Sequence, residues 1–232
     1  MRVELLDDAN SAAGTAAKII ASEARKAVAA RGRFVLAVSG GHTPWLMLRT
    51  LAGESMPWDA VHVMQVDERV APEGHPDRNL THLRESLLDH SPLRPDQIYG
   101  MPVEASNLEA AAELYATTLR NIAGPPPEID LVHLGLGPDG HTASLVPGDP
   151  VLNVTDTDVA TTAVYQGRRR MTLTYPALNR ARRIMWLVTG AEKAEMFRRF
   201  ISGDRTIPAG RVSRENAFVL ADRAADGVPE SK

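Results

Sequence analysis

The sequence contains no cysteine, which excludes disulfides, thiol nucleophiles and metal sites built on thiolates. It also has no basic surplus, because its formal net charge is −3 and its longest Lys/Arg run is Arg168-Arg169-Arg170. Proteins that bind the nucleic-acid backbone normally carry such a surplus, so this class of protein is disfavoured. A locally basic pocket, which a phosphorylated substrate requires, remains compatible with this composition.

Long apolar runs are missing as well. No window approaches the roughly 18 apolar residues of a membrane span, and residues 1–10 contain no apolar signal-peptide core. We therefore expect a cytoplasmic protein with no membrane partner. The chain is long and apolar enough to bury a core, since it has 232 residues of which 44% are hydrophobic and 24% charged. These values are typical of a globular protein with one sizeable α/β core.

Short apolar segments alternate with helix-forming segments along the chain. Buried strands are predicted at 34–38, 61–66, 129–134 and 184–188, and weaker strands at 159–164, 171–174 and 218–220. Helices are predicted at 11–31, 45–51, 80–88, 108–122 and 191–201. This alternation predicts an α/β fold, with a mainly parallel sheet and helices on both faces. No linker divides the chain, so we expect one domain over 1–232 with a frayed polar tail at about 222–232.

Three of the predicted strands run into loops that contain glycine and polar residues. Because ligands bind beyond the carboxyl ends of parallel strands, the three loops can converge on one site. The first loop is Ser39-Gly40-Gly41-His42-Thr43-Pro44. Its glycines allow close backbone approach, and its hydroxyls and the N–H groups at the next helix start suit a phosphate. It is neither a Walker A loop nor G-x-G-x-x-G, which disfavours nucleotides, and a plain strand-to-helix turn stays an alternative.

The second loop begins with Asp67-Glu68-Arg69 and reaches Asn79. Arg69 offers a planar guanidinium for phosphate or carboxylate, and Asp67 can accept hydrogen bonds from sugar hydroxyls. Glu68 suits an internal ion pair that fixes the loop equally well. His75 is better explained as part of an exposed Pro-rich loop.

The third loop, residues 135–144, contains Asp139 and His141 on either side of one glycine. The carboxylate can orient the imidazole, and a neutral histidine held in this way is a typical general base. A serine hydrolase is disfavoured, because G-x-S-x-G is missing and neither Ser39 nor Ser144 has a base provided by a motif. The histidines lack the spacing of a metal motif, so no metal site is expected.

Together these segments resemble the family that joins 6-phosphogluconolactonases and glucosamine-6-phosphate isomerases. The resemblance covers about residues 34–220, and its most specific stretch is Gly-Pro-Asp-Gly-His-Thr-Ala-Ser at 137–144. The further similar stretches are 39–44, 66–69, 170–174, 190–194 and 208–212. The resemblance implies a modified Rossmann-like fold without a dinucleotide. Arg69 replaces a tyrosine of the isomerases, and the Glu that completes their acid/base set is missing after Thr142, which favours the lactonase branch.

The resemblance also implies a site. Phosphate is expected on Gly40, Gly41 and Thr43, with help from Arg170, Lys193 or Arg211, and Asp67, Arg69 and Asn79 are expected to bind substrate. His141, oriented by Asp139, is expected to activate water against a phosphorylated sugar lactone of the pentose phosphate pathway, with no cofactor and no nucleic-acid partner. The chain departs from the family at Arg78-Asn79, where Ser-Asn is common, and at 166–169, where Lys-Pro-Pro is common. Two alternatives remain, namely an isomerase or deaminase with Asp67 as base, and a non-catalytic sugar-phosphate-binding module.

Overall fold

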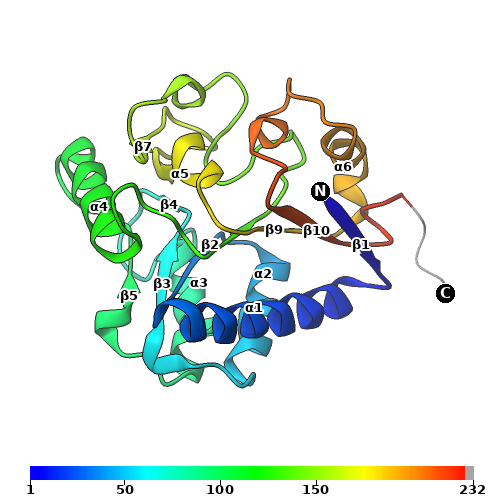
Figure 1. The fold of residues 1–232 in the computed structure, drawn as a ribbon. Coiled ribbons are helices and arrows are strands. Elements are labelled where there is room, and N and C mark those ends of the chain that lie inside the picture. The colour runs from blue at the N-terminus through cyan, green and yellow to red at the C-terminus, as the bar shows by residue number, and fades with distance from the viewer. Residues whose placement is uncertain (228–232) are drawn as a thin grey trace.

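Seven parallel strands form a sheet across the middle of the molecule (Figure 1) in a computed structural model that describes residues 1–227. Their order is β1-β10-β9-β6-β2-β3-β5. Their bounds are β1 Arg2–Leu6, β2 Phe34–Val38, β3 Val61–Gln65, β5 Ile98–Tyr99, β6 Leu131–Leu134, β9 Ile184–Val188 and β10 Ala217–Asp222. The prediction of a mainly parallel α/β sheet is confirmed.

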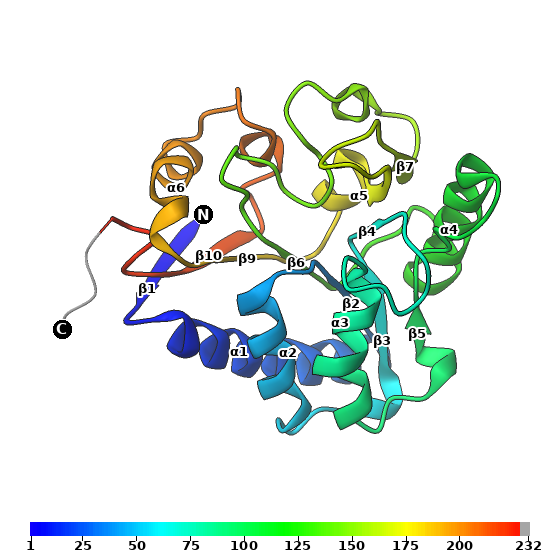
Figure 2. The same ribbon diagram turned by 180° about the vertical axis from the view of Figure 1, so that it is seen from behind.

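Helices cover both faces of this sheet. The α-helices are α1 Ala9–Arg31, α2 His42–Ala52, α3 Asn79–Ser86, α4 Leu108–Ala123, α5 Tyr175–Asn179 and α6 Ala194–Ile201. Figure 2 shows α1, α2 and α3 below the sheet and α5 and α6 above it. Side chains of β2 alternate between the two faces: Phe34 and Leu36 belong to the apolar core that contains residues of α1 and α2, and Val35 and Ala37 belong to the core that contains residues of α4 and α6.

A second, smaller sheet lies over the carboxyl ends of the large one. It is antiparallel and has the order β4-β8-β7, with β4 Asp67–Arg69, β7 Val159–Thr161 and β8 Arg170–Leu173. The sequence predicted β7 and β8 but treated residues 67–69 as a loop. The register of the small sheet places Arg69 directly opposite Arg170.

Short 3₁₀ helices fill several of the connections. They lie at Trp58–Ala60, Leu88–His90, Pro95–Gln97, Pro150–Asn153, Ala191–Lys193 and Pro208–Arg211. The predicted helix at 191–201 is therefore a 3₁₀ turn, labelled η5, followed by α6. No helix within residues 1–227 has the length and apolarity needed to cross a membrane.

The prediction of a frayed tail from residue 222 is wrong for 222–227. Asp222 belongs to β10 and is buried, and its carboxylate accepts hydrogen bonds from the N–H groups of Gly190 and Ala225. Ala225 is also fully buried. These contacts fix the turn that follows β10, while the remaining part of the predicted tail, 228–232, lies outside the described residues.

Candidate active site

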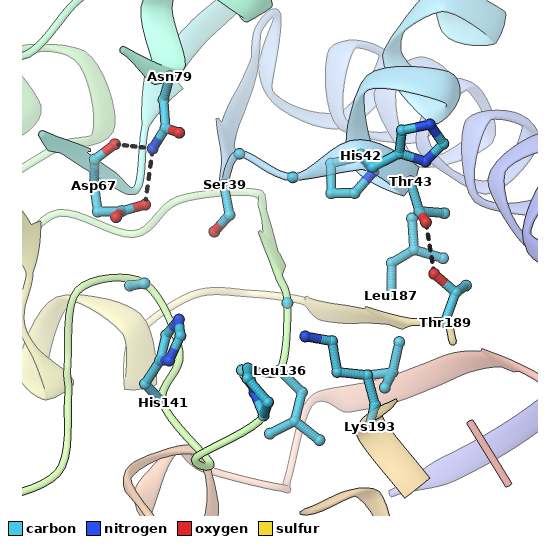
Figure 3. A pocket seen from close by; sticks show the side chains of 18 of the residues that line it. Ser39, His42, Thr43, Asp67, Asn79, Leu136, His141, Leu187, Thr189 and Lys193 are labelled. Atoms are coloured by element: carbon cyan, nitrogen blue, oxygen red, sulfur yellow. Dashed lines mark hydrogen bonds between the residues drawn. The ribbon is translucent and has the colours of Figure 1, made fainter. Parts of the chain in front are cut away.

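The loops that follow β2, β6 and β9 enclose a cavity of about 300 Å³ together with the small sheet. The cavity lies at the carboxyl ends of the parallel strands, as expected for this type of sheet. Most of the predicted site residues line it, namely Gly40, Gly41, Thr43, Asp67, Arg69, Asn79, His141, Arg170 and Lys193. Figure 3 shows Asp67, Asn79 and His141 at one end of this pocket and Thr43 and Thr189 at the other.

Two predicted residues do not line the cavity. Asp139 lies beside it, in contact with His141. Arg211 is not among the residues that line the cavity, and its Nε atom donates to the carbonyl of Arg205, so its role as one of three alternative phosphate ligands stays a prediction. The 3₁₀ turn Pro208–Arg211 explains this position, because the chain between Asp204 and Gly210 folds back on itself so closely that a Cβ at Gly210 would lie 1.9 Å from the Asp204 carbonyl oxygen.

Asp139 holds the imidazole of His141 by a short hydrogen bond. The His141 Nδ1 atom lies 2.5 Å from Asp139 Oδ1, which also accepts the His141 backbone N–H at 3.2 Å. The hydrogen bond from His141 keeps the pKa of the Asp139 carboxyl well below its usual range. The carboxylate is therefore ionised at neutral pH, and it favours the tautomer in which Nδ1 carries the proton and Nε2 is free to act as a base.

Gly137 provides the space for this ring. A Cβ atom at residue 137 would lie 2.1 Å from His141 Nδ1 and 2.2 Å from Cε1. The backbone of this loop also turns back on itself, because the Gly137 N–H donates to the His141 carbonyl at 2.8 Å. The glycine at this position is therefore required by its contact with the His141 ring.

Arg69 and Arg170 place two guanidinium groups side by side. They are opposite each other in the register of β4 and β8, and both line the cavity. Burial, and next the charge of Arg69, lower the pKa of Arg170. Among the described residues, neither Nε atom has a hydrogen-bond partner although both are buried. Two adjacent cations with buried free donors form a good environment for an anion.

Asp67 and Glu68 have different roles although they are neighbours. Asp67 lines the cavity, and its Oδ2 accepts from the buried Ser144 hydroxyl at 2.6 Å while Oδ1 faces the Asn79 amide at 3.3 Å. Glu68 is fully buried and accepts from the N–H groups of Asn79 and Leu80 at 2.7 and 2.8 Å, at the start of α3. Its carboxylate also pairs with Arg78 at 3.2 Å. The alternative that Glu68 fixes the loop is confirmed.

The other end of the cavity is built by the first loop. The Thr43 and Thr189 hydroxyls are 2.5 Å apart, and Figure 3 shows the Lys193 side chain reaching into the pocket. Gly41 precedes α2 with φ at +129° and provides no side-chain cap. A Cβ at residue 40 would lie 2.0 Å from Asn79 Oδ1, so the first two loops touch at Gly40. Lys193, the hydroxyls and the start of α2 together suit a phosphate.

The serine and histidine contacts bear on two chemistries considered from the sequence. The Ser144 hydroxyl donates to Asp67 and the Ser39 hydroxyl donates to the carbonyl of His133, so neither hydroxyl is paired with an imidazole nitrogen as that of a nucleophile would be. Within residues 1–227, no group of three His, Cys, Asp or Glu side chains is arranged as a metal site.

The family model described as glucosamine-6-phosphate isomerases/6-phosphogluconolactonase matches residues 7–220 of this sequence. The chain belongs to this family. The resemblance predicted from the sequence motifs is thereby confirmed, and the matched range contains every predicted site residue.

Several relatives within the family are named 6-phosphogluconolactonase. The chain is 42% identical over 172 residues to one from Synechocystis sp., covering 72% of this chain and 71% of the relative. It is 35% identical over 237 residues to one from Mycobacterium tuberculosis, covering 96% of each. Its fold is similar to the crystal structure of a 6-phosphogluconolactonase from Thermotoga maritima, with a TM-score of 0.84, 26% identity and coverage of 95% of this chain and 98% of that chain.

Thr189, Ser144 and Tyr165 are among the residues of this family member that touch the site but were not predicted from the sequence. Thr189 follows directly after β9, so the position of the strand end could have indicated it. Ser144 supports Asp67 from within a stretch already recognised as specific. Tyr165 donates from its hydroxyl to Asp139 at 2.9 Å, and no motif or spacing in the sequence indicates this contact.

Proposed function

We propose that this chain hydrolyses 6-phospho-D-glucono-1,5-lactone to 6-phosphogluconate. The observation that carries the proposal is the Asp139–His141 pair, whose imidazole lines a cavity that is also lined by the buried Arg170 and the half-buried Arg69. The lactonase names of the relatives support this choice of substrate. The proposed partner is thus a small phosphorylated lactone, not nucleic acid or a membrane, and the cytoplasmic location expected from the sequence stays a prediction.

In the proposed mechanism, His141 acts as a general base. Its Nε2 atom takes a proton from water while the water oxygen bonds to the lactone carbonyl carbon, and the carbonyl oxygen becomes an oxyanion. Asp139 stabilises the imidazolium that forms, as the carboxylate of a catalytic triad does. The bond between the carbonyl carbon and the ring oxygen then breaks, and His141 returns the proton to that ring oxygen.

The two ends of the cavity suit the two anionic parts of the substrate. Arg69 and Arg170 are near Asp67 and Tyr165, on the side of the cavity where His141 lies, and their free Nε donors suit the oxyanion. At the other end, Lys193, Thr43 and the start of α2 suit the phosphate. In this proposal Arg170 acts at the reacting carbonyl, whereas the sequence analysis expected it to help bind the phosphate.

An isomerase or deaminase is the second candidate function. The position of Asp67 in the cavity wall is the observation that favours it. Asp67 lines the cavity, as a carboxylate base would. Its two oxygens already face Ser144 and Asn79, however. The residue is also buried, with only 4% of its surface exposed. A carboxylate fixed in this way is better suited to accept from a substrate hydroxyl than to shuttle protons.

The test is an assay of freshly prepared 6-phosphoglucono-δ-lactone, corrected for spontaneous hydrolysis, with glucosamine 6-phosphate in parallel. We expect lactone opening without ammonia release, and a much slower reaction with glucono-δ-lactone, which lacks the phosphate.

His141→Asn should lower kcat by about 10²–10⁴-fold, the usual contribution of a general base. Asp139→Asn should lower it less, since the base remains.

Each alternative to the proposed lactonase reaction predicts a different result in these assays. Ammonia release from glucosamine 6-phosphate would select the second candidate. Tight binding of 6-phosphogluconate by a folded protein without turnover would select a binding module. A folded His141→Asn variant with the rate of the unmodified protein would remove His141 from the mechanism.

A further inference from the structure

Tyr165 contacts three residues of the proposed site from a hairpin that the family motifs do not include. Its hydroxyl donates to Asp139 Oδ2 at 2.9 Å, while Oδ1 of the same carboxylate accepts from His141. Its ring meets the His141 ring edge to face, with centroids 5.8 Å apart. The Arg170 guanidinium carbon lies 4.9 Å from the centre of the Tyr165 ring. One side chain thus touches the base, the carboxylate that orients it and a cation of the anion site.

The hairpin that carries Tyr165 is tightly built. Tyr165 and Arg168 exchange backbone hydrogen bonds of 3.0 and 3.3 Å, and the two residues between them, Gln166 and Gly167, have φ angles of +51° and +79°. This is the conformation of a two-residue turn, which is unfavourable for a residue with a side chain such as glutamine. Gln166 accepts from Arg170 at 3.1 Å and donates to the Tyr165 hydroxyl at 3.4 Å, so its strained position completes the cluster.

Arg168 fastens the same hairpin to the loop that follows β4. Its Nε donates to Asp77 Oδ2 at 2.6 Å and its Nη1 to the Val70 carbonyl at 3.3 Å. The hairpin is therefore held from its outer side by Arg168 and from its inner side by Arg170. Gln166 and Arg168 belong to the stretch 166–169, where the sequence departs from the family pattern described above.

We propose that Tyr165 is a positioning residue for the lactonase reaction, which fixes the Asp139 carboxylate by its second oxygen and thereby sets the orientation and basicity of His141. The inference rests on the proposed function for its link to catalysis. With Oδ1 bound to His141 and Oδ2 bound to Tyr165, the carboxylate is prevented from rotating. The hydroxyl also draws negative charge on Asp139 away from His141, so its removal should leave Asp139 a stronger partner for the protonated ring.

The state of the tyrosine agrees with this role. Burial, and next the hydrogen bond to Asp139, raise the pKa of Tyr165 above its usual value. The hydroxyl therefore keeps its proton at neutral pH and stays a donor. The other charged groups around the cavity are Asp67 and Arg69 of β4, Arg170 of β8, and Glu192 and Lys193 of η5. All of these are retained when only the hydroxyl is removed, so the variant deletes the 2.9 Å hydrogen bond to Asp139 and the longer one from Gln166 without changing a charge.

The test is Tyr165→Phe, which keeps the ring on Arg170 but deletes the hydroxyl. We expect kcat to fall about tenfold with little change in KM, since one hydrogen bond to a charged group is lost. The acidic limb of kcat/KM should move to higher pH by about half a unit or more, because Asp139 then stabilises the protonated ring more strongly. Tyr165→Leu, which also loses the ring, should raise KM in addition.

Tyr175→Phe is the matched control. The Tyr175 hydroxyl donates to the Pro208 carbonyl at 2.9 Å and touches no residue of the proposed site. This variant likewise deletes the hydroxyl of a partly buried tyrosine, and we expect its kcat, KM and pH profile to match those of the unmodified protein.

A second measurement makes the inference independent of turnover. Nuclear magnetic resonance of ring-labelled histidine, with His141→Asn used to assign the signal, follows the protonation of His141 directly. Its midpoint should move to higher pH in Tyr165→Phe and not in Tyr175→Phe. An unchanged midpoint together with an unchanged kcat would overturn the role of Tyr165. Absence of lactone turnover in the unmodified protein would instead contradict the proposed function, and the midpoint would still test the contact.

Discussion

At the scale of single residues, the geometry of the base depends on Gly137. A Cβ there would lie 2.1 Å from His141 Nδ1, so Gly137→Ala must move either the ring or the loop. We expect kcat to fall by about 10²-fold, because a displacement of roughly 1 Å from the productive geometry has an effect of this size. Steady-state kinetics on the phosphorylated lactone measure it, with the melting temperature recorded to confirm that the variant folds.

Gly135→Ala is the matched control for this substitution. It changes the same residue type in the same loop, but a Cβ at residue 135 meets no atom within 4 Å. A clearly smaller loss of kcat is expected from Gly135→Ala than from Gly137→Ala. Equal losses in the two variants would mean that the backbone of the loop, and not the contact with His141, determines the rate.

Single residues also show where reasoning from the sequence ends. Asp139 and His141 were predictable because they are two positions apart, so their contact is local. The contact of Tyr165 with Asp139 spans 26 residues and depends on how a hairpin folds over the pocket. Arg211 was predicted from a family block, but a 3₁₀ turn directs its side chain to the Arg205 carbonyl. The roles assigned to the residues that line the cavity stay predictions until the variants are measured.

At the scale of elements, Glu68 holds the start of α3 in place. Its carboxylate accepts two N–H groups of the first turn and pairs with the buried Arg78. Glu68→Gln leaves only one oxygen for these donors and removes the charge opposite Arg78. We expect the free energy of unfolding to fall by about 3 kcal/mol, as for other buried pairs that lose one partner. Urea denaturation measures this loss.

Glu73→Gln provides the comparison for that experiment. Glu73 faces Arg84 at 3.7 Å, and both side chains are more than half exposed, at 73% and 57%. An exposed pair of this kind contributes about 0.5 kcal/mol or less. If both variants had the same stability as the unmodified protein, Glu68 would not be the anchor of α3.

The elements that the sequence predicted best are those whose signal is local. The strands 34–38 and 184–188 match β2 and β9 residue for residue, because both are wholly apolar and buried on both faces. β4 was missed because its three residues are charged or polar and its partner, β8, comes about 100 residues later. α2 begins at His42, before the expected start at residue 45, so Thr43 and Pro44 are part of its first turn.

At the scale of the whole molecule, His133 makes stability depend on pH. It is fully buried in β6, its Nδ1 accepts the Ser39 N–H at 3.3 Å, and burial lowers its pKa from 6.5 to about 3. Between these values the unfolded chain binds a proton that the folded protein does not, so stability is lost as the pH falls. We expect this residue to contribute a slope of about 1.4 kcal/mol per pH unit between pH 6 and 4.

Urea denaturation at several pH values in this range measures the slope. His133→Gln, which retains an acceptor for Ser39, should flatten it, while His90→Gln at an exposed position should leave it unchanged. The half-buried His62, whose pKa is also lowered by burial, adds to the slope in the same direction in all three proteins. A slope that is identical with and without His133 would contradict this account.

The parallel sheet and its helices could be predicted from the alternation of strands and helices along the sequence. The edge strand β1 and the small antiparallel sheet could not. β1 was not predicted, because Glu4 interrupts a short segment that is exposed at the edge of the sheet. The antiparallel sheet was not predicted either, since the order of weak strands does not reveal their pairing. That residues 1–232 form one domain stays a prediction, which the continuous seven-stranded sheet from β1 at one edge to β5 at the other supports.

The pairing of β1 with β10 also determines the order in which the fold can form during synthesis. Arg2 lies opposite Phe218 and Leu6 opposite Asp222, so the first strand to leave the ribosome has to wait for one of the last. Contacts between residues so far apart in sequence form slowly, because a long loop must close first. The buried carboxylate of Asp222 reaches the Gly190 backbone, three residues before Lys193, only when β10 is in place. The end of the pocket proposed to bind phosphate therefore gains its last supporting contact only after almost the whole chain is translated, and we expect a nascent chain truncated before β10 to lack that contact.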